Sequence, residues 1–264
     1  MRHTTLAITL AVTSLLTGGI AQADERESGN NNNNACRDLP SQAALRTALK
    51  AARATANGGF NLDMWATLVN RDGVVCAVAF TGTDRGDQWP GSRVISAQKA
   101  NTANAFSLPN LALSTANLYS AVQPGGSLFG LQESNPVDTD AAYGGNAANK
   151  GQANDPMVGN AIGGVNVFGG GLALYNSSHK LVGGLGVSGD SSCADHNIAW
   201  KTRHALNLDY VTAGVSGDAT RPDNIVYDIV TLAGHSTGTS TGGWGHPACT
   251  AAATAIAATL PTKQ

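Results

Sequence analysis

Apolar and polar positions first follow a helical spacing and then two strand-like runs. After Ser41, alanines and leucines recur every three to four residues until the glycines at 58 and 59, which predicts a helix with Ser41 as its N-cap. Two apolar runs follow, at residues 64–70 and 74–81. The sequence Arg-Asp-Gly at 71–73 between them is typical of a hairpin turn, so the two runs are predicted to pair as antiparallel strands.

Two helical patterns and three short strand patterns come next. A helix is predicted over residues 92–106, and Asn110 is predicted to cap another that continues to Val122. Strands are predicted at the short apolar runs 165–168, 172–176 and 181–187, and a helix follows at 194–207, capped by Ser191 or Ser192.

These elements define a fold class. Their order is one helix, two strands, two helices, three strands and one helix. Closely spaced strands tend to pair in antiparallel fashion, so we predict an α+β domain with a five-stranded, mainly antiparallel sheet and helices packed on it. In the tail we predict a strand at 225–230, a Gly/Ser/Thr loop at 234–245 and an alanine-rich helix that opens at Pro247.

The N-terminal segment has the features of an export signal. Residues 1–23 combine Arg2 with an apolar stretch at 6–16 and the small-residue motif Ala-Gln-Ala at 21–23. The apolar stretch is too short to span a bilayer, so we expect an exported, periplasmic or extracellular protein. Residues 24–38, which include an unbroken asparagine run, are expected to form a flexible leader.

The rest of the chain divides into one domain with two additions. We expect a domain at 39–208, a loop excursion within it at 123–163, and a C-terminal extension at 209–264 that packs on the domain. The excursion is rich in Gly, Asn, Ala and Asp. We therefore expect it to lie at the surface, outside the sheet, and to be removable without loss of the fold.

Charge and cysteine content limit the partners and the compartment. The formal net charge is −2, and loss of Arg2 with the signal makes it −3, which argues against a nucleic-acid footprint. Four scattered cysteines in an exported chain favour disulfides, although the sequence alone does not choose among three pairings. Our hypothesis joins two pairs, Cys36 with Cys76 and Cys193 with Cys249.

Four short motifs occur in an order that resembles the GlcG/HbpS family. They are the hairpin at 68–74, the helix segment Gln-Lys-Ala-Asn-Thr-Ala-Asn-Ala-Phe at 98–106, the strand start Gly-Gly-Val at 163–165, and Gly-Val-Ser-Gly at 186–189 followed by Asp195. Asn70 stands where the family usually has Asp. The resemblance covers about residues 39–208 and does not extend to the excursion or the tail.

The resemblance implies a profilin-like fold, homo-oligomers and haem binding, which in exported members is linked to redox sensing or haem breakdown. We therefore place a ligand site between the helix 92–106 and the corner 186–200. Arg93 and Lys99 are predicted to meet the haem propionates, and Thr102, His196 and His204 are candidate iron ligands. The corner residues are Gly186, Ser188 and Asp195, where missing side chains would let a flat ligand come close.

Three other kinds of site are alternatives to haem binding: a dinucleotide site, a hydrolase triad and a zinc site. The sequence 184–189 fits the pattern G-x-G-x-x-G, but it lies within a predicted strand among antiparallel neighbours, which argues against a dinucleotide site. Ser188, Asp195 and His196 include the residue types of a hydrolase triad, yet adjacent helix positions diverge by about 100°. His235 and His246 lack a third zinc ligand nearby. A binding protein is favoured over an enzyme acting on a small organic or corrinoid-like ligand, and over a structural or adhesive domain.

Overall fold

The computed structural model describes residues 35–231 and 238–264. The predicted signal peptide, residues 24–34 of the leader, and His235 lie outside these ranges. Among the described residues, no helix combines the length and the apolar character needed to cross a membrane.

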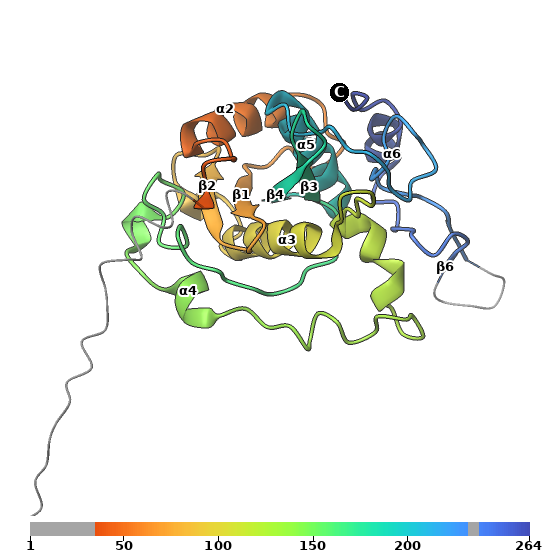
Figure 1. The fold of residues 1–264 in the computed structure, drawn as a ribbon, viewed down its shortest axis with the longest axis horizontal. Coiled ribbons are helices and arrows are strands. Elements are labelled where there is room, and N and C mark those ends of the chain that lie inside the picture. The colour runs from red at the N-terminus through yellow and green to blue at the C-terminus, as the bar shows by residue number, and fades with distance from the viewer. Residues whose placement is uncertain (1–34, 232–237) are drawn as a thin grey trace, which may run out of the picture.

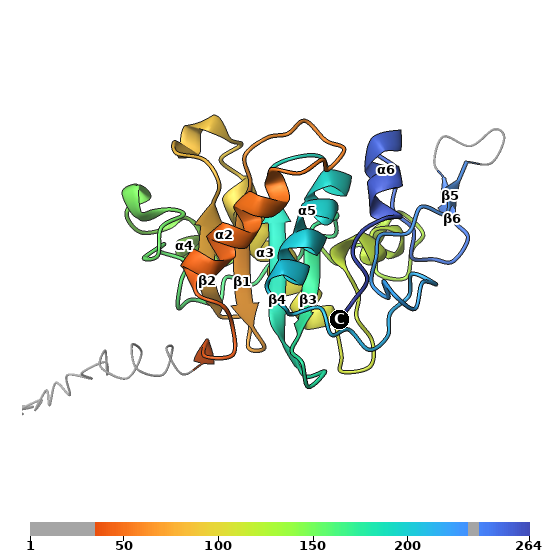
Figure 2. The same ribbon diagram turned by 90° about the horizontal axis from the view of Figure 1, so that it is seen from above.

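A four-stranded antiparallel sheet forms the centre of the fold, in the order β2-β1-β4-β3 (Figure 2). Its strands are β1 (Trp65–Asn70), β2 (Val75–Phe80), β3 (Gly171–Tyr175) and β4 (Leu181–Ser188). The β1–β2 hairpin turns at Gly73, whose φ of 79° suits glycine. The prediction of an α+β fold with antiparallel strands is confirmed, and the sheet has four strands instead of five.

Helices cover both faces of this sheet (Figure 1). The helices α2 (Gln42–Arg53) and α5 (Ser192–Ala205) lie on one face, and α3 (Ser92–Phe106) lies on the other. Ser41 and Ser191 cap α2 and α5 through their side-chain oxygens, as predicted. The largest core cluster fills the space under α2 and α5 and includes Leu45, Leu68 and Trp200.

The missing fifth strand is the segment 165–168. Side chains, and not a neighbouring strand, accept hydrogen bonds from its backbone N–H groups. Asn166 N donates to Thr102 Oγ1 at 3.0 Å, and Phe168 N donates to Asn166 Oδ1 at 3.1 Å. Because these donors are satisfied locally, the segment runs beside α3 outside the sheet.

Three other predicted elements also differ, namely the helix from Asn110, the strand at 225–230 and the helix from Pro247. The helix expected from Asn110 is replaced by two short 3₁₀ segments, Thr115–Leu118 and Ser120–Val122, and Ser114 with Asn117 forms the capping box. In the tail, β5 (Ile229–Val230) and β6 (Thr239–Ser240) form a two-stranded ribbon. The last helix, α6 (Ala251–Ala257), begins after Pro247 because Thr250 supplies its cap.

The excursion at 123–163 contributes to the core, contrary to expectation. It contains α4 (Thr139–Tyr143), and its side chains Ala142, Met157 and Ile162 are buried in a cluster with Trp65 of β1. Although the segment is rich in glycine and polar residues, these few apolar side chains cover the edge of the sheet that β1 and β2 form. Its deletion would therefore remove part of the core.

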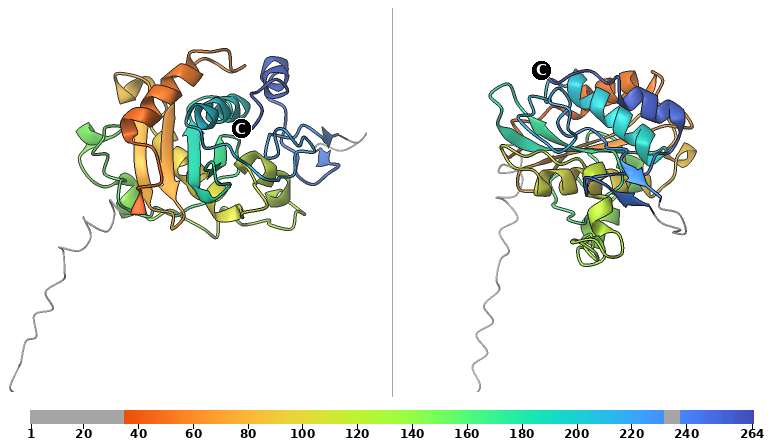
Figure 3. Two further views of the ribbon diagram at one scale, coloured as in Figure 1. Left: turned by 45° about the horizontal axis from the view of Figure 1, so that its top comes forward. Right: turned by 90° about the vertical axis from the view of Figure 1, so that its right-hand side faces the viewer.

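Two disulfides and a buried ion pair attach the additions at either end of the domain. Cys36 is bonded to Cys76 and Cys193 to Cys249, which confirms the predicted pairing. The tail lies against α5, where Arg203 pairs with Asp223 at 2.6 Å in a fully buried contact. Figure 3 shows α6, in dark blue, beside α5, in cyan.

Candidate functional site

The glycines of β4 bring the backbone of α3 against the sheet. A Cβ atom on Gly186 would lie 1.9 Å from the carbonyl oxygen of Ser96, and one on Gly184 would lie 2.2 Å from that of Ala100. Helix backbone thus occupies the space that was predicted to admit a flat ligand. These glycines set the close contact between α3 and β4, and that contact positions the residues at the end of β4.

A cleft of about 310 Å³ lies where the start of α3 meets the corner between β4 and α5. Its polar and charged lining comes from α3 and from the corner between β4 and α5. Its apolar lining comes from α3, from the loop before it and from the segment 165–168. The lining residues are Trp89, Gly91, Ser92, Ile95, Lys99, Phe168, Ser188, Asp190, Ser192 and Asp195.

A buried ion pair links α3 to α5 at this cleft. Lys99 Nζ lies 2.7 Å from Asp195 Oδ2 and donates to the carbonyl oxygen of Val187 at 3.0 Å. The other oxygen of Asp195 accepts from the backbone N–H of Asp190 at 2.8 Å. Burial raises the pKa of Asp195 to about 6, against the opposing effect of Lys99. The carboxyl group therefore titrates nearer to neutral pH than an ordinary aspartate.

Two aromatic side chains at the cleft are half exposed. Trp89, in the loop before α3, is 53% exposed, and Phe168, in the segment beside α3, is 44% exposed. Large apolar groups of this kind at a cleft favour contact with a flat, apolar ligand or with another protein surface. The sequence indicated neither residue as a binding group, because Trp89 fell in a predicted loop and Phe168 in a predicted strand.

Arg93 and Thr102 lie elsewhere on α3. Arg93 is buried in a two-point ion pair with Asp155 of the excursion, in which Nε lies 2.9 Å from Oδ2, and it also donates to the carbonyl oxygen of Ala142. Thr102 Oγ1 donates to Gln98 O and accepts from Asn166 N. Neither residue lines the cleft.

The two candidate histidines of α5 face the tail and the far end of the helix. His196 is fully buried, and its Nε2 accepts from the backbone N–H of Ile225 at 3.1 Å. Burial lowers the pKa of His196 to about 3, so the ring is neutral at physiological pH. His204 Nδ1 lies 2.6 Å from Asp209 Oδ2. The structure thus gathers Lys99, Ser188 and Asp195 of the predicted site and separates the others.

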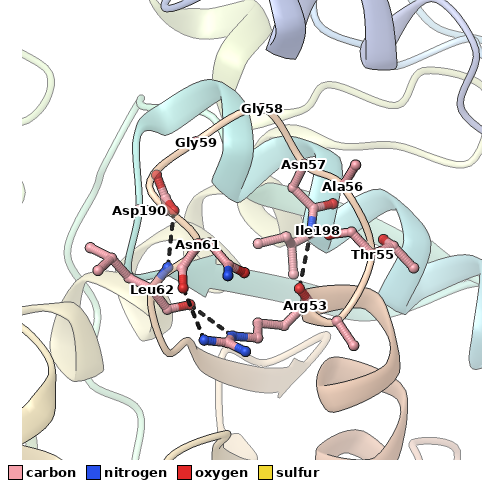
Figure 4. Close-up of a pocket in the computed structure, with 11 residues that line it drawn as sticks. Arg53, Thr55, Ala56, Asn57, Gly58, Gly59, Asn61, Leu62, Asp190 and Ile198 are labelled. Carbon is pink, nitrogen blue, oxygen red and sulfur yellow. Dashed lines mark hydrogen bonds between the residues drawn. The ribbon is translucent and has the colours of Figure 1, made fainter.

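A neighbouring pocket of about 320 Å³ lies behind Asp190, between α5 and the loop that follows α2 (Figure 4). The Asp190 carboxylate accepts from the backbone N–H groups of Phe60 and Leu62 at 2.9 and 3.3 Å. Arg53 donates to the carbonyl oxygens of Asn61 and Leu62 on the same loop. These bonds hold the loop in place, so the polar side chains drawn in Figure 4 have a structural role.

The fold defines a small α+β domain, with a four-stranded antiparallel sheet between helices. The model of the HbpS-like family, described as haem-degrading protein HbpS-like, matches residues 41–203. Because the match covers more than half of the chain, the protein belongs to the HbpS-like family. The matched range includes both elements that form the cleft.

Similar solved structures also exist. A complex of PduOC with haem is 24% identical, with a TM-score of 0.43, and the alignment covers 63% of this chain and 93% of that one. Klebsiella pneumoniae protein ORFY is 23% identical, with a TM-score of 0.42, and the alignment covers 63% of this chain and 90% of that one. A double mutant of Streptomyces reticuli HbpS is 17% identical, with a TM-score of 0.41, and the alignment covers 75% of this chain and 99% of that one. No curated protein matches the chain.

Proposed function

We propose that this is an exported haem-binding protein, a homo-oligomer that holds haem at the cleft between α3 and the β4–α5 corner for storage, sensing or breakdown. One observation carries the proposal: the half-exposed rings of Trp89 and Phe168 line the cleft at the place where two family motifs meet. Family membership supports haem as the ligand.

The side chains of the cleft fit the macrocycle better than they fit the iron. Aromatic side chains pack well against a flat conjugated ring. No histidine, cysteine, methionine or tyrosine lines the cleft, however, and no group of three or more His, Cys, Asp or Glu side chains within the described residues could hold a metal ion. We therefore assign no iron ligand, and the proposal rests on the contacts to the ring.

The propionates of haem would need cations other than those predicted. Lys99 is paired with Asp195 and Arg93 with Asp155, and all four side chains are buried. Releasing either cation would leave a buried carboxylate unpaired, which is costly. We therefore expect Lys99 and Asp195 to hold α3 and α5 together beneath the ligand.

The test is a titration of the purified protein with haemin, followed by the Soret band. Saturation near one haemin per chain or per dimer is expected. The double variant Trp89→Ala/Phe168→Ala should bind at least about tenfold more weakly, because each aromatic contact contributes about 0.5–1.5 kcal/mol beyond its buried area.

The matched control is Phe60→Ala/Phe129→Ala, which removes two exposed aromatic rings outside the cleft. If the cleft variant binds haemin like the parent, or if the control weakens binding equally, the placement is wrong. Light scattering with and without haemin measures the oligomer, and loss of the Soret band in the presence of a reductant distinguishes breakdown from storage.

A further inference from the structure

A third cavity, of about 310 Å³, is lined in part by the loop before α3 and shares no lining residue with the cleft. Four separate parts of the chain form it, namely β1, the loop before α3, α3 itself and the excursion. Its lining residues are Trp65, Asp84, Arg85, Gly86, Pro90, Arg93, Val94, Tyr143 and Lys150. The haem proposal uses none of them.

Positive charge is in excess at this cavity, although the chain as a whole is slightly acidic. Within the described residues, the Arg85 guanidinium and the Lys150 ammonium groups have no hydrogen-bond or ion-pair partner. Arg93 is neutralised by Asp155, and the Asp84 carboxylate accepts from the backbone N–H of Gly86 at 2.8 Å. Two cations are thus available to an anionic ligand.

A buried hydrogen-bond donor without a partner belongs to the same cavity. Trp65 is only 2% exposed, and no group in the described structure accepts from its Nε1. Its ring stacks on Phe80 with the centroids 4.5 Å apart. Because a buried donor without an acceptor is unfavourable, it is rare in native proteins and often indicates a missing water, ion or ligand.

Apolar side chains complete the cavity. Val94 is buried, Pro90 is exposed, and Tyr143 at the end of α4 is 56% exposed, so an aromatic ring is available to cover a ligand. Gly151 allows the excursion to pass over Trp65, since a Cβ atom there would lie 3.0 Å from the indole ring. A volume of this size suits a small organic molecule.

We propose that this cavity binds a small aromatic carboxylate. Arg85 and Lys150 would pair with the carboxylate, for which the planar guanidinium of arginine is well suited. The ring would lie among Trp65, Val94 and Tyr143, and a carboxylate oxygen would accept from the indole N–H of Trp65. This site is independent of the haem cleft, because the two share no lining residue.

The test uses 1-naphthoate as the probe and 1-naphthalenemethanol as its uncharged counterpart. Binding is followed by NMR of the ¹⁵N-labelled protein, with the Trp65 indole signal assigned through Trp65→Phe. We expect 1-naphthoate to shift this signal saturably at one site per chain and the alcohol to bind at least tenfold more weakly. The variant Arg85→Gln/Lys150→Gln should lose at least tenfold in affinity, since a charge-assisted bond contributes about 1.5–3 kcal/mol.

The control Lys50→Gln/Lys180→Gln removes the same charge at positions that do not line the cavity and should bind like the parent. The inference is overturned if the alcohol binds as well as the acid, if no saturable binding occurs, or if the Arg85/Lys150 variant keeps full affinity. A loss of 1-naphthoate binding in Trp89→Ala/Phe168→Ala would place the probe in the haem cleft and would also overturn it. Failure of haem binding alone leaves this site standing.

Discussion

Replacing Asp155 with alanine should destabilise the protein more than any surface ion-pair change. Asp155 is 2% exposed and accepts four hydrogen bonds, from Arg93 Nε, Arg93 Nη2, and the backbone N–H groups of Gly151 and Met157. The substitution leaves a buried guanidinium without its counter-charge and removes the acceptor of two backbone donors. It also removes the ion pair that links the excursion to α3.

The magnitude follows from these contacts. Removing one partner of a buried ion pair typically costs about 3–5 kcal/mol, because the remaining charge is not solvated. Total stability of a domain is about 5–15 kcal/mol. Asp155→Ala is therefore expected to lower the free energy of unfolding by a large fraction of its total. The variant Arg93→Met/Asp155→Leu, which buries neither charge, should recover part of the loss. The rest should remain, because the backbone N–H groups of Gly151 and Met157 still lack their acceptor.

Urea unfolding followed by circular dichroism measures the change, with Asp218→Ala as the control. Asp218 forms a partly exposed pair with Arg221 at 2.8 Å, and such pairs contribute about 0–1 kcal/mol. If Asp155→Ala costs no more than this control, or if the double variant is as unstable as the single one, the buried Arg93–Asp155 pair does not stabilise the protein as proposed.

Two further outcomes are expected. Burial lowers the pKa values of His196 and His246 to about 3 and 4, so both resist protonation when folded and accept protons at their ordinary pKa when unfolded. Stability is then complete above about pH 6.5 and falls below it. The raised pKa of Asp195 acts in the opposite direction between about pH 4 and 6, but one carboxyl group offsets only one histidine. A net loss of about 1 kcal/mol per pH unit should remain between pH 6 and 4.5, measured by urea unfolding at each pH. His196→Gln should remove most of this slope, and an unchanged slope would refute the explanation. Separately, Gly186→Ala should cost about 3 kcal/mol or more, because its Cβ would overlap the carbonyl oxygen of Ser96, whereas Gly91→Ala meets only ordinary contacts. Equal urea midpoints for these two variants would contradict the proposed contact between α3 and β4.

Local sequence patterns correctly predicted helix starts and a hairpin turn, because a few neighbouring residues determine each of them. Ser41 and Ser191 identified the starts of two helices, and Gly73 identified the hairpin. Asp155 could not be recognised in the same way, because its importance depends on Arg93, which lies 62 positions earlier in the chain. A buried partner of this kind helps to hold a glycine-rich segment in the core, and composition does not reveal it.

The candidate site was only partly predictable for a similar reason. Family motifs led to Lys99, Ser188 and Asp195, which do meet at one cleft. The helical spacing placed His196 and His204 on the right helix, but it did not show that the tail covers the side of α5 on which His196 lies. The apolar contribution of Phe168 was hidden, because its segment was expected to lie inside the sheet.

The two disulfides determine how the chain responds to a protease. Each joins a cysteine inside the family match, at Cys76 or Cys193, to one outside it, at Cys36 or Cys249. A cut between 37 and 75 or between 194 and 248 therefore leaves a single covalent molecule, and both flanking additions stay attached to the domain. A cut between 77 and 192, which includes the whole excursion, gives two pieces even without a reductant. For cuts within the two disulfide loops, the flanks would separate only in a reducing compartment, so the redox state of the surroundings decides whether a protein cut there remains whole.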